Sequence, residues 1–218
     1  MGSVSGSPSA AAWGILGGTF DPIHLAHLAV AEQTRETLGL AGVLFIPAGV
    51  PVHKPDRLVT PVGHRLAMVE LAIDENPAFH LSRIEVDRPG PSYTVETLER
   101  LHADLGRPSD DPFVLIISVE ALAGFLGWRE PQRILELARL AVVPRYGYRP
   151  MGASWLAEHF PGQHDRVIFL DAPDLGHSAS AIRGLSAAGR SVRYLVPDAV
   201  ARYMTEHRLY PTELWTKN

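Results

Sequence analysis

The sequence of 218 residues contains no cysteine, no excess of positive charge and no long apolar run. Without cysteine the chain forms neither disulfides nor thiolate metal sites, and a reducing compartment is compatible with its composition. A formal net charge of −4 argues against a dedicated nucleic-acid binder, although a local pocket for a small anion needs only a few cations. No stretch approaches the roughly 20 apolar residues of a membrane-spanning helix. We therefore expect a cytoplasmic protein that binds neither nucleic acid nor membrane.

The first twelve residues, MGSVSGSPSAAA, are small and polar. They lack the basic start and the long apolar centre of a signal peptide, so residues 1–12 are predicted to be a disordered tail. The remaining residues, 13–218, are predicted to form a single domain, because a hydrophobic content of 46% is enough for a sizeable core. A homo-oligomer is compatible with this composition.

Short apolar segments alternate with amphipathic segments along the chain. The strand candidates are rich in leucine and β-branched residues, as in parallel sheets that are buried on both faces. This βαβα order predicts an α/β fold with a doubly wound parallel sheet and helices on both faces. We predict strands at 13–16, 43–46, 113–117, 140–143 and 167–170, and helices at 25–38, 62–74 and 95–105.

A further helix is predicted near the C-terminus. Pro197 and Asp198 are typical of a helix start. Val200, Tyr203 and Met204 then form an apolar face, which we interpret as simple packing against the rest of the domain.

The junction between the first strand and the first helix has the sequence WGILGGTFDPIHLAHLAVAEQ, residues 13–33. Gly17 and Gly18 permit a close approach of a ligand to the backbone. A helix that begins here directs unpaired N–H groups and its positive dipole end toward a bound phosphate. His24 and His27 share one face of the first turn, where two imidazoles suit hydrogen bonds to phosphate oxygens. The motif therefore favours a nucleotide site.

Other interpretations of this junction exist. Asp21-Pro22 is typical of a turn or of a helix cap. A glycine pair after a strand is a weak signal, and histidines with this spacing are more often surface or core residues than catalytic groups. A zinc site is disfavoured, because no glutamate lies between the histidines and no third ligand is nearby. We assign no protein ligand to a metal.

Further motifs follow in order: PAGVPVHKP (47–55), HRLAMVELAI (64–73), PSYTVETL (91–98), LGWREP (126–131), SASAIRGL (178–185) and LVPDAVARYMTEHRLY (195–210). Together with GGTFDPIHLAHL (17–28), this set resembles the bacterial nicotinate-nucleotide adenylyltransferase family, of the nucleotidylyltransferase superfamily, from Trp13 to Tyr210. The resemblance implies a Rossmann-like fold with an H-x-G-H signature on its first helix. It also implies transfer of AMP from ATP to nicotinate mononucleotide, which gives nicotinate adenine dinucleotide (deamido-NAD) and pyrophosphate in NAD biosynthesis.

Two positions depart from the family pattern. Ala26 stands where the family usually has glycine, which adds one methyl group where adenine approaches. Ser118-Val119-Glu120 replaces a G-x-D whose aspartate helps to hold the sugar of the nucleotide. Because Glu120 keeps the carboxylate and moves it outward by one methylene, we expect the function to survive.

The resemblance also implies an ATP site. His24 and His27 would contact the ATP phosphates, and His27 is the better candidate for the transition state. Ser178, Ser180 and Arg183 resemble the start of a second phosphate-binding helix; without the first motif, an ordinary helix cap with a solvated arginine would be preferred. The other residues implied to bind ATP are Gly17, Gly18, Thr19, Phe20, Ser118, Glu120, Arg145 and Ile182.

An acceptor site for the mononucleotide is implied in the same way. Trp128 resembles the tryptophan that stacks on the pyridine ring, with a core tryptophan as the alternative. Thr94 lies at the start of a helix whose positive end favours the carboxylate of nicotinate over a neutral amide, with a plain helix cap as the alternative. Lys54, which follows His53 between two prolines, would reach the reacting phosphates unless it is a surface lysine. The implied acceptor site also contains Asp21, His53 and Tyr93.

The implied catalytic residues are His24, His27, Lys54 and Arg183. The attacking phosphate is already anionic, so the mechanism is direct in-line attack with no general base and no covalent enzyme intermediate. A Mg²⁺ ion is expected to bridge phosphate oxygens with few protein ligands.

Three alternatives are considered. A phosphopantetheine adenylyltransferase or a cytidylyltransferase would share the first motif but lack the combination of VPVHKP, PSYT and GW. A nucleotide-binding sensor without turnover would follow if the Ser118 to Glu120 change had damaged the ATP site. A class I tRNA synthetase fragment is rejected, because its lysine-rich second motif is absent and the chain is acidic.

Overall fold

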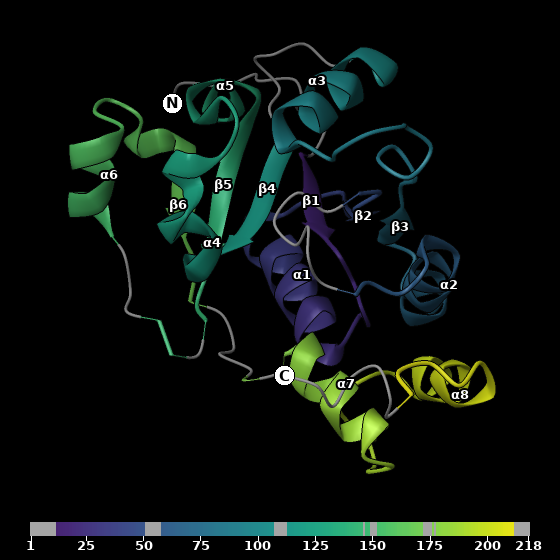
Figure 1. Ribbon diagram of the computed structural model, residues 1–218. Helices are drawn as coiled ribbons and strands as arrows, with labels where there is room; N and C mark the ends of the chain where they lie inside the picture. The colour runs from purple at the N-terminus through teal and green to yellow at the C-terminus, as the bar shows by residue number, and fades with distance from the viewer. Residues whose placement is uncertain are drawn as a thin grey trace, which may run out of the picture.

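A parallel β-sheet forms the centre of the molecule (Figure 1). The computed structural model describes residues 12–50, 58–106, 113–145, 147–148, 152–171, 176 and 178–211. Within these ranges six strands pair in parallel in the order β3-β2-β1-β4-β5-β6. The strands are β1 (Trp13–Gly18), β2 (Gly42–Pro47), β3 (Phe79–Leu81), β4 (Phe113–Ser118), β5 (Ala138–Val143) and β6 (Val167–Phe169).

At least one α-helix lies between each described strand and the next, and two more follow the last strand. Two short 3₁₀ segments, η1 (Phe125–Gly127) and η2 (His164–Arg166), add to the connections. The described α-helices are α1 (Leu25–Leu38), α2 (Val62–Ile73), α3 (Thr94–Asp104), α4 (Val119–Ala123), α5 (Pro131–Leu137), α6 (Ala153–His159), α7 (Ala179–Ala187) and α8 (Asp198–Glu206).

Alternation along the strands produces two apolar cores, one on each face of the sheet. Successive strand residues point to opposite faces. In β4, Val114 and Ile116 belong to the first core, which also contains residues of α1, α2, α7 and α8. Leu115 and Ile117 belong to the second core, with residues of α3, α4, α5 and α6. The predicted α/β fold, with helices on both faces of a parallel sheet, is confirmed.

The strand order creates a crevice at one edge of the sheet. The chain adds β2 and β3 on one side of β1 and then returns to place β4 on the other side. At such a switch point the connections leave β1 and β4 in opposite directions, which opens a space beyond the carboxyl ends of these strands. Among the described helices, none has the length and apolar character that crossing a membrane requires.

Most elements match the sequence prediction closely, and those that were missed are short. Helix α1 begins and ends at the predicted residues, and the other predicted elements agree within two residues at each end. Strand β3 was missed because the exposed His80 interrupts its three residues, whereas the three residues of β6 are all apolar and were predicted. Helices α4, α5 and α6 have five to seven residues, which is too short for a periodic signal.

The predicted tail lies outside the described residues except for Ala12. The carbonyl of Ala12 accepts a hydrogen bond from the Ala41 N–H at 2.9 Å. Ala12 also packs against the first core, so this one residue of the predicted tail is part of the packed domain.

Helix α8 packs on the domain through the predicted apolar face. Val200 and Met204 are buried, and Tyr203 is half-buried. The Tyr203 hydroxyl lies 2.9 Å from Nδ1 of His64 on α2, which joins the two helices by a polar contact as well. This confirms packing as the role of the face.

Truncation of this face tests how much α8 contributes to stability. Met204→Ala should lower the free energy of unfolding by about 2–4 kcal/mol, because it removes a buried side chain and leaves a cavity. Arg202→Ala, at an exposed position of the same helix, should change it by less than about 0.5 kcal/mol. Urea denaturation of both variants measures the difference. Equal midpoints would mean that α8 is not docked through Met204.

Candidate functional site

A cavity of about 460 Å³ opens at the carboxyl ends of β1 and β4. Its walls come from the end of β1, the first turn of α1, the residue after β2, the start of α3 and the ends of β4 and β5. This is the crevice in which open α/β sheets bind their ligands. Residues predicted for the site that line it are Gly17, Gly18, Thr19, His24, His27, Thr94, Ser118, Glu120, Trp128 and Arg145.

The start of α1 offers an anion both open space and a positive electrostatic potential. A Cβ atom at Gly17 would meet no atom within 4 Å, so a side chain there would project into the cavity. Helix α1 has no acidic residue in its first turn, so none neutralises the positive end of its dipole. The methyl group of Ala26, the first departure from the family pattern, also lines this wall.

The two histidines form a stacked pair at the start of α1. His24 is the N-cap residue and is 2% exposed, whereas His27 is half-buried. Their ring centroids are 3.7 Å apart, and the backbone N–H of His24 donates to Nδ1 of His27 at 3.2 Å. Because Nδ1 accepts this bond, the neutral His27 ring carries its proton on Nε2, which makes Nε2 a hydrogen-bond donor. Phe20 packs edge-on against the same ring.

The second departure lies at the mouth of the cavity. The Ser118 hydroxyl accepts from the Ala121 N–H at 3.2 Å and so caps α4. The exposed Glu120 carboxylate lies 3.4 Å from Nε of Arg145 and accepts from the Tyr148 hydroxyl at 3.0 Å. The longer acidic side chain is therefore paired with the cation that was predicted to touch ATP.

Arg183 meets the α1 loop without lining the cavity. Its Nη1 donates to the backbone carbonyl of Asp21 at 2.7 Å, and its Nη2 donates to the Ser180 hydroxyl at 3.1 Å. The Ser178 hydroxyl accepts from the Ala181 N–H, which makes Ser178 the N-cap of α7 as the sequence indicated. Ile182 is buried in the first core, so its side chain is not exposed to a ligand.

The Asp21 side chain has a different place from the one predicted. It is 4% exposed and does not line the cavity. Its Oδ1 accepts from the Tyr210 hydroxyl at 2.8 Å, and its Oδ2 accepts from the Thr60 N–H at 3.3 Å. The carboxylate is thus engaged inside the protein as a structural group, and its assignment to the mononucleotide stays a prediction. Asp21-Pro22 forms a turn, and the helix cap is His24.

Two other predicted residues also lie off the cavity wall. Phe20 is buried in the first core. Tyr93 packs against the second core, and the Arg129 guanidinium lies 4.8 Å from the centre of its ring. His53 and Lys54 lie outside the described residues.

Sequence reasoning missed a polar group on the α3 side of the cavity. Glu85, Ser92 and Thr97 line it. The Thr97 hydroxyl donates to Glu85 Oε1 at 2.7 Å, and the Ser92 hydroxyl accepts from the Gly49 N–H at 3.1 Å. A Cβ at Gly49 would lie 2.4 Å from the Glu85 carbonyl oxygen, so only glycine permits this approach. The PSYTVETL motif contains Ser92 and Thr97, but only Tyr93 and Thr94 of it were assigned to the site, and no local pattern marked Glu85.

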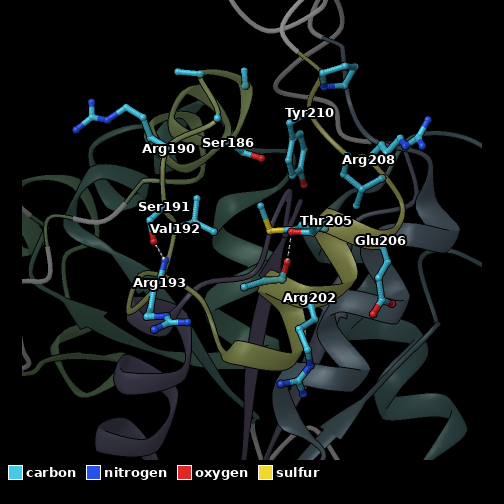
Figure 2. Close-up of a pocket in the computed structure, with 17 residues that line it drawn as sticks. Ser186, Arg190, Ser191, Val192, Arg193, Arg202, Thr205, Glu206, Arg208 and Tyr210 are labelled. Carbon is cyan, nitrogen blue, oxygen red and sulfur yellow. Dashed lines mark hydrogen bonds between the residues drawn. The ribbon is translucent and has the colours of Figure 1, made fainter.

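A second hollow, of about 1050 Å³, lies between α7 and α8. It contains none of the predicted site residues. In Figure 2 the side chains of Arg190 and Arg208 extend to opposite sides of the hollow, and those of Arg193 and Arg202 lie below it. The guanidinium groups thus do not converge on a bound anion, and the cavity beside β1 and β4 is the better candidate. Within the described ranges, no group of three or more His, Asp or Glu side chains is placed to hold a metal ion.

Comparison with known sequences gives consistent matches. The family model described as cytidylyltransferase-like matches residues 15–185. A probable nicotinate-nucleotide adenylyltransferase of Roseiflexus sp. (strain RS-1) is 48% identical over 202 residues, which are 93% of this chain and 99% of that protein. A protein of the same description from Thermomicrobium roseum is 45% identical over 199 residues, which are 91% of each chain.

Comparison with solved structures supports the fold. The structure of Plasmodium falciparum nicotinic acid mononucleotide adenylyltransferase complexed with NaAD superposes with a TM-score of 0.75 at 16% identity. The match covers 92% of this chain and 97% of that chain. The same enzyme complexed with APC gives a TM-score of 0.73 at 15% identity. At these identities the likeness is one of fold.

The environment of Glu85 predicts a pH effect on stability. Burial raises the pKa of Glu85, and the hydrogen bonds from Thr97 and Ser92 only partly oppose it. Because the folded state holds the Glu85 proton more tightly than the unfolded state, the protonated carboxyl contributes to the free energy of unfolding. This contribution is fully present below the ordinary pKa of 4.5 and is lost as the pH rises through the higher pKa of the folded state. Glu85→Gln should therefore gain stability relative to the wild type as the pH is raised from 4.5 toward neutrality.

Urea midpoints measured across this pH range test the effect. Glu70→Gln, at an exposed position of α2, is the control and should follow the wild-type profile. If the difference between the wild type and Glu85→Gln were the same at every pH, the carboxyl would not be in the environment described.

Proposed function

Since the chain belongs to the nicotinate-nucleotide adenylyltransferase family and matches the cytidylyltransferase-like model over most of its length, we propose that it catalyses adenylyl transfer to nicotinate mononucleotide in the cavity at the carboxyl ends of β1 and β4. The enzyme transfers the adenylyl group of ATP to nicotinate mononucleotide and releases pyrophosphate, a step of NAD biosynthesis. The observation that carries this conclusion is the 48% identity over nearly the full length of both chains. The proposed location of the reaction is supported by the lining of one cavity, which contains the histidine pair, Arg145 and Trp128.

The reaction joins two anions and needs no catalytic nucleophile from the protein. A phosphate oxygen of nicotinate mononucleotide attacks the α-phosphorus of ATP, the new P–O bond forms, and the bond from the α-phosphorus to the pyrophosphate oxygen breaks. The attacking oxygen is ionised near neutral pH, so it requires no general base. The protein has to align the two reactants and disperse negative charge in the transition state.

The α1 side of the cavity provides the groups for this charge. His27 Nε2–H is a donor whose ring is oriented by the bond at Nδ1. The dipole of α1 adds positive potential at the same place. Arg183, held by the Asp21 carbonyl and the Ser180 hydroxyl, brings a permanent cation to this loop. We assign these groups to the ATP phosphates, while Lys54 stays a prediction.

The α3 side suits the pyridine carboxylate. Trp128 and Thr94 both line the cavity, so an aromatic ring and a helix N-terminus are available to the acceptor. Glu96, in the first turn of α3, would oppose a carboxylate if its charge faced the cavity. It pairs instead with Arg88 and with Arg129, whose Nη1 lies 2.8 Å from Glu96 Oε1. This pairing preserves the preference for nicotinate over nicotinamide.

Magnesium enters the proposal as part of the substrate. A Mg²⁺ ion bound to ATP neutralises phosphate charge and retains most of its waters, so few protein ligands are needed. We place the reaction in the cytoplasm, with the two nucleotides as partners and no role for nucleic acid. A homo-oligomer stays a prediction.

An acceptor assay tests the proposed function. Pyrophosphate release from MgATP should be fast with nicotinate mononucleotide, slower with nicotinamide mononucleotide and absent with phosphopantetheine, because the helix N-terminus favours a carboxylate. A coupled pyrophosphate assay with the three acceptors in parallel measures this order. Release with phosphopantetheine alone would contradict the acceptor assignment. Tight ATP binding without release under any condition would instead favour a nucleotide sensor.

Removal of one imidazole tests the phosphate side. His27→Ala should slow turnover by at least about tenfold, roughly 1.4 kcal/mol of barrier, because a donor to the transition state is lost. His164→Ala, at an exposed position of η2, serves as the histidine control. Steady-state rates at saturating substrates measure the effect. An unchanged rate in His27→Ala would remove this residue from the mechanism.

A further inference from the structure

The loop that leads from β1 to α1 is held by segments far away in the sequence. The Thr19 carbonyl accepts from Nη1 of Arg65 on α2 at 2.8 Å. The Leu25 N–H donates to the Leu195 carbonyl at 3.0 Å. The Asp21 carbonyl accepts from Arg183. The histidine pair at the start of α1 therefore follows a loop that is held by other parts of the chain.

Tyr210 makes the most distant of these contacts. It is 2% exposed, and its hydroxyl donates to Asp21 Oδ1 at 2.8 Å across 189 positions of sequence. Burial and the Asp21 charge raise the pKa of Tyr210, so the hydroxyl stays a protonated donor. The bond joins the C-terminal segment directly to the residue that holds Arg183.

The backbone on both sides of this bond is strained. Phe20, next to Asp21, has φ of 49°, and Tyr210 has φ of 62°. Residues with a side chain adopt this left-handed region only at a cost, unless the surroundings determine it. The Tyr210–Asp21 bond is one such determinant, because it is buried and joins Tyr210 to the residue that follows Phe20.

The charge on Asp21 is balanced within the same cluster. Arg65 is buried, and its Nε and Nη2 donate to the carbonyls of Thr60 and Gly49. Burial lowers the pKa of Arg65, while Asp21 and Tyr210 oppose this effect. The carboxylate thus depends on a few fixed partners, so the loss of one should alter the position of the loop.

We propose that Tyr210 is a positioning residue for adenylyl transfer. Through its hydrogen bond to Asp21, it fixes the loop between β1 and α1, which sets the position of His24 and His27 at the start of α1 and receives the guanidinium of Arg183. The inference rests on the proposed function, which assigns His27 and Arg183 to the ATP phosphates. Tyr210 itself lies off the cavity wall and acts through Asp21. A small displacement of such a loop is enough to misalign an in-line reaction.

Loss of the Tyr210 hydroxyl should affect the pocket for nicotinate mononucleotide less than the groups that contact ATP. Trp128 packs against the second core, on the opposite face of the sheet from Tyr210, which belongs to the first core. Loss of the Tyr210 hydroxyl should therefore lower kcat while the KM for nicotinate mononucleotide changes little. A fall in kcat at an unchanged KM would distinguish misplacement of the groups that contact phosphate from a general loss of structure.

The experiment compares two variants that each remove a single hydroxyl. Tyr210→Phe keeps the ring and loses the bond to Asp21. Tyr203→Phe, on α8, loses a contact to His64 but none to the loop, and is the matched control. Both are assayed by pyrophosphate release below the melting temperature, which is recorded for each. We expect at least about a tenfold fall in kcat for Tyr210→Phe, less than about a twofold change in its KM for nicotinate mononucleotide, and near wild-type values for Tyr203→Phe.

A second readout does not require turnover. The imidazole proton resonances of His24 and His27 should shift or broaden in Tyr210→Phe and stay in place in Tyr203→Phe. Unchanged resonances together with unchanged kcat would overturn the inference, as would equal losses in both variants. If the wild type released no pyrophosphate, the proposed function would fail, and the resonances alone would still decide whether Tyr210 positions the loop.

Discussion

The buried carboxylate of Asp21 is the constraint on which the site depends. A charge removed from water is costly unless it is hydrogen-bonded and balanced. Asp21 meets this requirement with the Tyr210 hydroxyl, the Thr60 N–H and the nearby charge of Arg65, while its own carbonyl receives Arg183. Because these partners come from different parts of the chain, satisfying one carboxylate brings them together. These contacts of Asp21 therefore fix the position of the start of α1, which carries the histidine pair.

The sheet divides the reaction between its two faces. Helices α1 and α7 lie on the face of the first core and bring the imidazoles and Arg183, which suit phosphate. Helix α3 and the segment around Trp128 pack on the second core and suit the pyridine ring. The imidazoles of the first face and Trp128 of the second line the same cavity beyond the carboxyl ends of β1 and β4, where the strand order reverses. In the proposed reaction this doubly wound sheet would place the two anionic substrates side by side, with no side chain acting as a nucleophile.

Local patterns in the sequence predicted the fold and much of the cavity wall. The glycine pair and the spacing of His24 and His27 identified the turn after β1, because both signals act over a few residues. The place of the Asp21 side chain could not be read, since it is decided by Tyr210, 189 positions away. Glu85 was missed for a related reason: it lies outside any regular element and gains its role from Thr97 and Ser92. Strand β3 gave no apolar run, because His80 stands in the middle of its three residues.

The central claim is that the loop after β1 brings donors and a cation to the reacting phosphates. A crystal structure with nicotinate mononucleotide and a non-hydrolysable ATP analogue tests it most directly. The account predicts His27 Nε2 and the Arg183 guanidinium within about 3 Å of phosphate oxygens, with the pyridine ring against Trp128. Phosphates bound away from both side chains, for example in the hollow between α7 and α8, would contradict it.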